Sequence, residues 1–70
     1  MDNEKLMEKI QESGFKKTYI AYVLGLSVQG LNNKLNGKYS WWLTEINILI
    51  KLLDLTEDDV WEIFFANEYE

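Results

Sequence analysis

Carboxamide side chains gather in one short segment of this 70-residue chain. Gln29, Asn32, Asn33 and Asn36 lie within eight residues, just after Val28. A carboxamide offers a donor and an acceptor side by side, which suits paired hydrogen bonds to N6 and N7 of adenine in a DNA major groove, and valine suits the thymine methyl group. Asparagine is also a poor helix former, so three within one helix indicate a use. The alternative is a solvated helix face.

Lysines surround this segment. Lys16 and Lys17 precede it, Lys34 lies within it and Lys38 follows it. Residues 13–43 therefore carry +4, whereas residues 1–12 carry −2 and residues 44–70 carry −7, for a net charge of −5. Lys16 and Lys17 open a predicted helix, where a cation is unfavourable unless a phosphate docks there. These lysines predict phosphate contacts; the alternative is that they simply face water.

Gly30 lies within the amide-rich helix. A glycine in a helix interior costs about 0.5–1 kcal/mol relative to alanine. It allows a close approach of the helix to base edges, which would make Gly30 part of the base-contacting set, or it is an unoptimised position. The sequence alone leaves both interpretations open.

Five short helices must position these residues, and each is bounded by residues that start or end helices. The predicted helices span about 3–13, 17–24, 28–36, 42 or 43–53, and 57–66. Asp2 or Asn3, Ser27 and Thr56 are suited to cap helix starts, while Gly14, Gly25 and Gly37 follow helix ends. Proline is absent and only four glycines occur, which excludes a turn-rich β architecture. We therefore expect a single all-α domain over residues 1–70.

Apolar residues at helical spacing predict the core. Phe15, Leu26 and Leu55 lie between the predicted helices and are also expected to turn inward. The helix residues expected to face inward are Leu6, Met7, Ile10, Ile20, Ala21, Leu24, Leu31, Leu35, Leu43, Ile46, Leu49, Ile50, Leu53, Val60, Ile63 and Phe64.

Other large apolar residues fall away from these stripes. Exposed aromatic residues usually mark an interface, so they predict a self-association surface. The alternative is that some fold back over a thin core. The surface is expected to comprise Trp41, Trp42, Ile48, Leu52, Trp61 and Phe65.

The segment 17–36 reads as two short helices joined by a tight turn, with the second helix held outward. It resembles the Cro-type and phage-repressor family of helix-turn-helix proteins, which have the lambda-repressor-like fold. The residues that carry the resemblance are Ile20-Ala21, Gly25-Leu26-Ser27, Leu31 and Lys34-Leu35-Asn36-Gly37-Lys38, with weaker agreement across the predicted C-terminal helices at 43–66. The chain departs from the family pattern in its acidic net charge, in Gly30 and in Trp41-Trp42.

The resemblance implies five helices and dimeric binding to a double-stranded DNA operator in a phage or bacterial setting. It places Lys17 and Asn36 where the family contacts phosphates, and Lys38 would extend that contact. The function expected is a sequence-specific transcriptional regulator that acts as a homodimer. The alternative is a protein-interaction module on the same fold that binds a partner repressor, in the manner of an antirepressor, with little affinity for DNA.

Composition argues against other classes. The chain has no Cys and no His, which removes disulfides, thiolate metal sites and the commonest general base. We expect no enzyme activity, metal, cofactor or small-molecule substrate. The acidic start is unlike a signal peptide, and no apolar run reaches the ~18 residues of a membrane span. The expected location is the bacterial cytoplasm or nucleoid.

Overall fold

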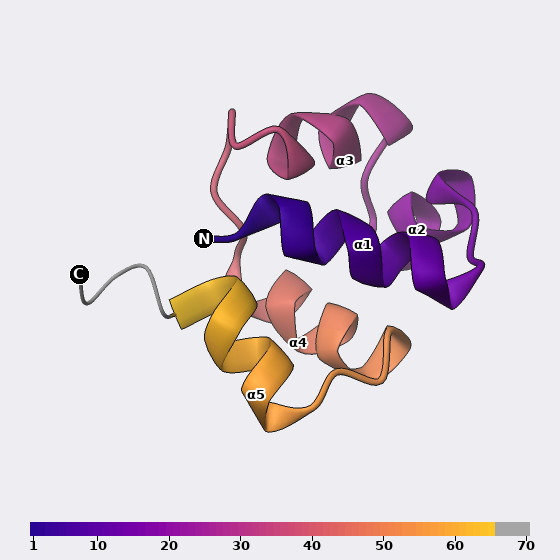
Figure 1. Ribbon diagram of the computed structural model, residues 1–70. Coiled ribbons are helices and arrows are strands. Elements are labelled where there is room, and N and C mark those ends of the chain that lie inside the picture. Colours follow the sequence, from indigo (N-terminus) through magenta and orange to yellow (C-terminus); the bar gives the residue numbers. More distant parts are fainter. Residues whose placement is uncertain (66–70) are drawn as a thin grey trace.

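The computed structural model describes residues 1–65, and helices dominate them. That part of the chain contains no strand, which confirms the predicted all-α class with five helices. The helices are α1 (Asn3–Ser13), α2 (Lys17–Leu24), α3 (Val28–Leu35), α4 (Leu43–Leu52) and α5 (Glu57–Val60), the last continued by a π-helical segment, η1 (Trp61–Phe65) (Figure 1). The predicted end of the last helix, at residue 66, lies outside the described residues.

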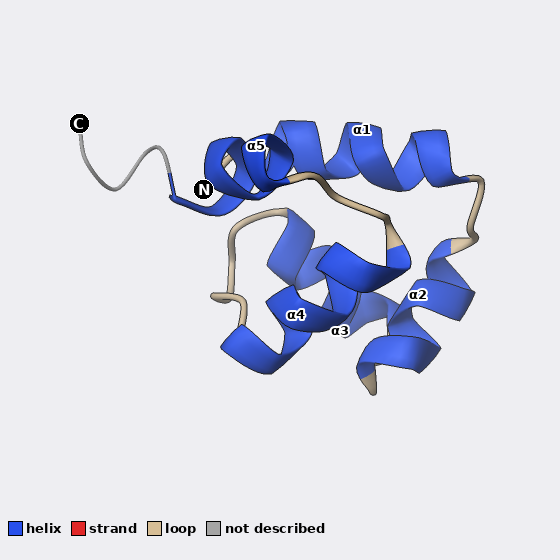
Figure 2. Cartoon of the chain, turned by 90° about the horizontal axis from the view of Figure 1, so that it is seen from below, coloured by secondary structure: helices blue, strands red, loops and turns tan. Residues whose placement is uncertain are grey.

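The helices form two layers (Figure 2). The segment α5–η1 lies beside α1, and the backbone N–H of Asp2 donates to the carbonyl of Ile63 at 2.7 Å. Beneath them, α2 packs against both α3 and α4, while α3 also contacts α1. The molecule measures 33 × 24 × 20 Å along its principal axes. The layering leaves α3 at one edge, away from α5 (Figure 1).

Helix boundaries follow the capping residues that the sequence contains. Asp2 Oδ1 accepts a hydrogen bond from the Lys5 N–H at 3.0 Å, and Ser27 Oγ accepts one from the Gly30 N–H at 3.0 Å. Thr56 Oγ1 accepts from the N–H three residues later at 3.1 Å. Each bond satisfies a helix-start donor that has no partner within its helix. The predicted caps are therefore confirmed, and of the two candidates for the first helix, Asp2 is the cap.

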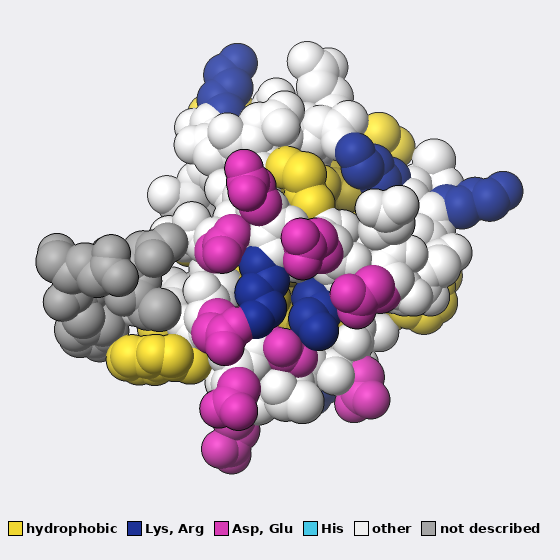
Figure 3. Space-filling model, in the orientation of Figure 1, with side chains coloured by type: hydrophobic (Ala, Val, Ile, Leu, Met, Phe, Trp, Pro, Cys, Tyr) yellow, Lys and Arg dark blue, Asp and Glu magenta, His cyan; other side chains and the backbone are white. Residues whose placement is uncertain are grey.

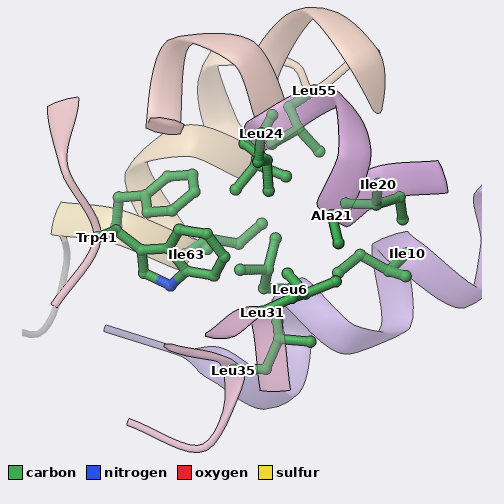
Figure 4. Close-up of a cluster of buried hydrophobic side chains, with 12 residues drawn as sticks. Leu6, Ile10, Ile20, Ala21, Leu24, Leu31, Leu35, Trp41, Leu55 and Ile63 are labelled. Atoms are coloured by element: carbon green, nitrogen blue, oxygen red, sulfur yellow. The ribbon is translucent and has the colours of Figure 1, made fainter. Parts of the chain in front are cut away.

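One core lies between the two layers (Figure 4). Its buried hydrophobic side chains are Leu6, Ile10, Ile20, Ala21, Leu24, Leu31, Leu35, Trp41, Leu49, Leu55, Ile63 and Phe64. Eleven of these twelve residues were expected to face inward. Partly buried side chains pack against them from the side: Leu26, Ile46, Ile48, Ile50, Leu52, Leu53, Val60 and Phe65.

Trp41 is the unexpected member of the core. It was predicted to lie on a self-association surface, but its side chain is only 8% exposed and is directed into the apolar cluster (Figure 4). That prediction is wrong because Trp41 precedes α4 in an irregular segment, so helical periodicity does not determine the direction of its side chain. A domain this small has few residues with which to fill a core. A large indole at this point supplies much of the buried area.

Three residues expected in the core lie at the surface instead. Leu43 is 69% exposed, and Phe15 and Met7 are also exposed. Leu43 shares a helix face with Ile46, but α4 begins at Leu43, and Trp41 takes the buried position at this end of the helix. Phe15 packs against Tyr19, with ring centroids 5.3 Å apart, rather than into the core.

The described residues contain neither a helix long and apolar enough to cross a membrane nor a cluster of three acidic residues placed to hold a metal ion.

Candidate nucleic-acid interface

A three-residue turn joins α2 to α3. Gly25 adopts a left-handed conformation, with φ of 73°, which glycine adopts at the lowest cost. The Leu26 N–H donates to the Ala21 carbonyl at 2.8 Å, closing the end of α2, and Ser27 begins α3. Ala21 and Leu31 are both buried in the core that the two helices share. The turn and these contacts fix α3 relative to α2.

Three of the four amide side chains at α3 lie on the side opposite its buried face. Leu31, Lys34 and Leu35 are buried. At about 100° per residue, Gln29, Asn33 and Asn36 lie along the opposite side of the helix and form an amide line. Gln29 and Asn36 are exposed, and Asn33 is half-buried. Asn36, which was predicted to contact phosphate, thus shares a line with two residues predicted to contact bases.

The flank of α3 that faces α2 carries Val28 and Asn32. Val28 is exposed, in keeping with its predicted base contact. Asn32 is half-buried, and its Oδ1 accepts a hydrogen bond from Lys17 Nζ at 3.1 Å. This bond ties the first turn of α2 to the middle of α3. One side of the Asn32 amide is therefore already occupied within the protein.

Gly30 has a local explanation that the sequence did not suggest. It is the third residue of α3, in the first turn, and its N–H donates to the capping Ser27 Oγ. A Cβ at position 30 would lie 3.2 Å from that oxygen and 3.8 Å from Leu26 Cβ. A side chain here would therefore point toward the turn instead of outward. The missing side chain is explained by the cap, without any approach to base edges.

Three of the four lysines predicted to contact phosphates are exposed: Lys16, Lys17 and Lys38. None of them forms an ion pair within residues 1–65. The Lys38 N–H donates to the Asn33 carbonyl at 2.9 Å, which fixes this residue at the end of α3. Its ammonium lies 5.7 Å from the ring centroid of Tyr39.

The start of α2 is open to an anion. Lys16 is the residue before the helix, its side chain makes no capping hydrogen bond, and the first turn contains no acid. The unpaired N–H groups at a helix start carry partial positive charge. Lys16 and Lys17 add two ammonium groups at this point, so the end of α2 offers a phosphate both charge and hydrogen-bond donors.

Lys34 is buried, and its predicted phosphate contact is wrong. It is only 8% exposed and forms an ion pair with Glu45 of α4. The ammonium also lies 5.7 Å from the ring centroid of Trp41 and 5.4 Å from that of Trp42. The reason is its place in α3, one residue before Leu35 on the buried side. The sequence predicted a solvent-exposed side chain because a charged residue is rarely buried without a partner, and the sequence does not reveal the partner.

Exposed tyrosines are a feature that the sequence reading missed. Tyr22 on α2 is 80% exposed, and Tyr19 and Tyr39 are about half exposed. A phenolic hydroxyl can donate to a phosphate oxygen. The available signal was the spacing in α2, where Ile20, Ala21 and Leu24 define the buried side and leave position 22 pointing away.

Charges are separated between faces of the molecule. Figure 3 shows acidic side chains gathered over α1 and α5, and lysines projecting at the edges that carry α2 and α3. The lysines of α1 are engaged by these acids: Lys5 pairs with Glu62, and Lys9 lies 3.5 Å from Asp59 and 3.8 Å from Glu12. The edge formed by α2 and α3 therefore keeps its positive charge in a protein of net charge −5.

The residues predicted for self-association are in different environments. Trp42 is 70% exposed and Trp61 is about half exposed, whereas Ile48, Leu52 and Phe65 are half-buried against the protein's own core. This packing agrees with the alternative that part of this set covers a thin core. Trp42 and Trp61 are the members that present most surface to a partner.

Comparison with protein families shows where the chain belongs. The model of the family described as "Protein of unknown function (DUF739)" matches residues 1–67. Because the match spans nearly the whole chain, the protein belongs to this family. Comparisons with curated proteins and with solved structures found no match.

Proposed function

We propose that the protein is a sequence-specific DNA-binding transcriptional regulator that acts as a homodimer on an operator. In this proposal α2, the turn and α3 form a helix-turn-helix of the lambda-repressor-like type, and α3 enters the major groove. The observation that carries the proposal is the outward face of α3, where an amide line lies beside exposed lysines, in a segment, residues 13–43, that contains no acid.

Base reading is assigned to Gln29, Asn33 and Val28. The two amides suit adenine, and the exposed valine suits a thymine methyl group. The chain has no arginine, which is the commonest reader of guanine. The operator should therefore hold A·T pairs at the positions that Gln29 and Asn33 meet.

Phosphate contacts are assigned to the two ends of this surface. Lys16, Lys17 and the open start of α2 receive one strand, and Lys38 at the end of α3 receives the other. The exposed Tyr22 hydroxyl is a further candidate for a phosphate contact. Such contacts fix the register of the protein on the duplex while base contacts supply the specificity.

A twofold dimer would present two such surfaces to one operator. The exposed Trp42 and Trp61 are the candidates for its interface. Two recognition helices about one DNA turn apart, ~34 Å, would read a palindromic site.

The experiment is selection of binding sites from random double-stranded DNA, followed by affinity measurements on the selected site and on single-base variants. Gln29→Ala should weaken binding to the selected site by about 1–3 kcal/mol and remove the preference at one base pair. Asn47→Ala, which removes an exposed amide from α4, is the matched control and should leave the affinity and the base preference unchanged. Failure to enrich any sequence at low salt would refute the proposal.

The interaction-module alternative is favoured by one observation, the adjacent exposure of Trp42 and Leu43. Their large apolar surface suits a protein partner better than a phosphate backbone. If the protein forms a stable heteromer with a DNA-binding repressor and retards no DNA at low salt, this alternative replaces the first.

A further inference from the structure

We propose that the buried Lys34–Glu45 ion pair is a positioning device that sets the orientation of α3 and thereby the sequence discrimination of the interface. This inference rests on the proposed function. It concerns two residues that contact no DNA in that proposal.

One carboxylate oxygen serves two helices. Glu45 Oε1 accepts a hydrogen bond from the Trp42 N–H at 2.8 Å, which closes the start of α4. The same oxygen pairs with the Lys34 ammonium on α3. The position of Lys34 is therefore fixed relative to the first turn of α4. Because Lys34 directly follows Asn33, a rotation of α3 about its axis would have to break this pair.

The pair lies at a flank of α3 that borders an open groove. A groove of about 670 Å³ separates the α2–α3 turn from residues 39–45, and both Lys34 and Glu45 line it. The α2–α3 turn and the Lys17–Asn32 hydrogen bond hold the other flank of α3. Its buried side is held by apolar contacts through Leu31 and Leu35, and such contacts have no directional preference. A charge-assisted hydrogen bond does have a preferred geometry. At this flank the ion pair defines the angle of the helix.

Stability alone does not account for the pair. Burying two charges costs free energy, and replacing a buried pair by neutral residues of similar volume is often neutral or stabilising. Here each side chain is about nine-tenths buried. We therefore assign the pair a role in fixing a single orientation of α3. An experiment can separate this role from an effect on the free energy of unfolding.

The test uses the double variant Lys34→Met/Glu45→Gln in the full chain. Glutamine keeps an oxygen that can accept from the Trp42 N–H, and methionine keeps the length of lysine without its charge. The probe is the selected operator and the same duplex with one A·T pair changed. Lys51→Met, which removes an exposed lysine from α4, is the matched control.

We expect the double variant to remain folded by circular dichroism and to lose about tenfold or more in its preference for the selected site, as for one lost base contact. Its salt dependence should equal that of the wild type, because Lys34 meets no phosphate. Lys34→Arg, which keeps the charge but places it differently, should fold and lose part of the same preference.

Two results would overturn the inference. An unchanged preference in a folded double variant or in Lys34→Arg would show that the pair is merely structural. A salt slope reduced by about 0.9 per subunit would make Lys34 a phosphate contact. Absence of any selected site for the wild-type protein would instead refute the proposed function itself, and the inference with it.

Discussion

The slope of log affinity against log salt concentration should reflect the number of lysines that contact phosphates. Burial of Lys34 leaves three exposed lysines per subunit at the proposed interface, Lys16, Lys17 and Lys38, and hence six in a dimer. Each neutralised phosphate contributes about −0.9 to the slope of log affinity against log salt, so the expected slope is about −5. If Lys34 also met a phosphate, the slope would be about −7.

The two slopes differ enough to be distinguished. Raising the salt concentration from about 50 to about 200 mM should weaken binding by about 10³-fold with six contacts and by about 10⁴-fold with eight. Fluorescence anisotropy of a labelled operator, titrated with protein at four or more KCl concentrations, gives the slope directly. The substitution that tests the count is Lys17→Ala.

Lys17→Ala removes two ammonium groups per dimer and should flatten the slope by about 2. It also releases Asn32 Oδ1, so some loss of sequence preference should accompany the loss of affinity. Lys51→Ala removes the same charge from α4 and should leave the slope unchanged. A wild-type slope near zero, or the same slope for Lys17→Ala and the wild type, would show that α2 and α3 do not lie against DNA.

Three further predictions concern local structure. Lys16→Asp should raise stability by about 1 kcal/mol in chemical denaturation, because aspartate caps α2 and matches the helix dipole, yet weaken DNA binding in the anisotropy assay; a parallel gain in both would contradict the phosphate assignment. Gly30→Ala should be close to neutral in the wild type but stabilising by about 0.5–1 kcal/mol in a Ser27→Ala background, since the close oxygen is then absent; equal effects in both backgrounds would contradict this reasoning. The hydrogen bond from the backbone N–H of Thr56 is the largest cause that lowers the pKa of Asp59 below 3.8. The ionised Asp59 carboxylate therefore stabilises the folded state above about pH 4, and this stabilisation is lost as the pH falls through the lowered pKa of the folded state. Melting curves between about pH 5 and pH 3 should therefore show a smaller loss for Asp59→Asn than for the wild type, and an identical loss would contradict the assignment.

Helix positions were predictable because their signals are local. The cap at Ser27 and the left-handed Gly25 each act within four residues, so both ends of the α2–α3 turn could be read from residue types alone. The apolar stripe of α3 likewise needs only its own spacing. The outward direction of Gln29 and Asn33 follows from that stripe, which is why the amide line could be located before the structure was known.

The errors came from contacts between residues distant in the sequence. Lys34 pairs with Glu45, which is eleven residues later and separated from it by an irregular segment. No local pattern in the sequence predicts such a partner. Trp41 lies in that same segment, where neither helical nor strand periodicity applies. Gly30, for which the sequence left two interpretations open, is explained instead by its distance to a capping hydroxyl three residues earlier, a feature of the backbone geometry.

Net charge is a poor guide to what this protein binds, because its charges lie on different faces. Acids of α5 and η1 pair with lysines of α1: Lys9 lies 3.5 Å from Asp59, and Lys5 pairs with Glu62. At physiological ionic strength the Debye length is about 8 Å, while even the shortest dimension of the molecule is 20 Å. Acids on α5, which lies on the opposite side of the molecule from α3 (Figure 1), are therefore largely screened from a duplex at the α2–α3 edge. At low salt the screening length grows to about 30 Å near 0.01 M, so repulsion from these acids should then oppose binding. The salt plot should accordingly curve below its straight line at the lowest salt concentrations, whereas a protein with lysines spread over its whole surface would show no such curvature.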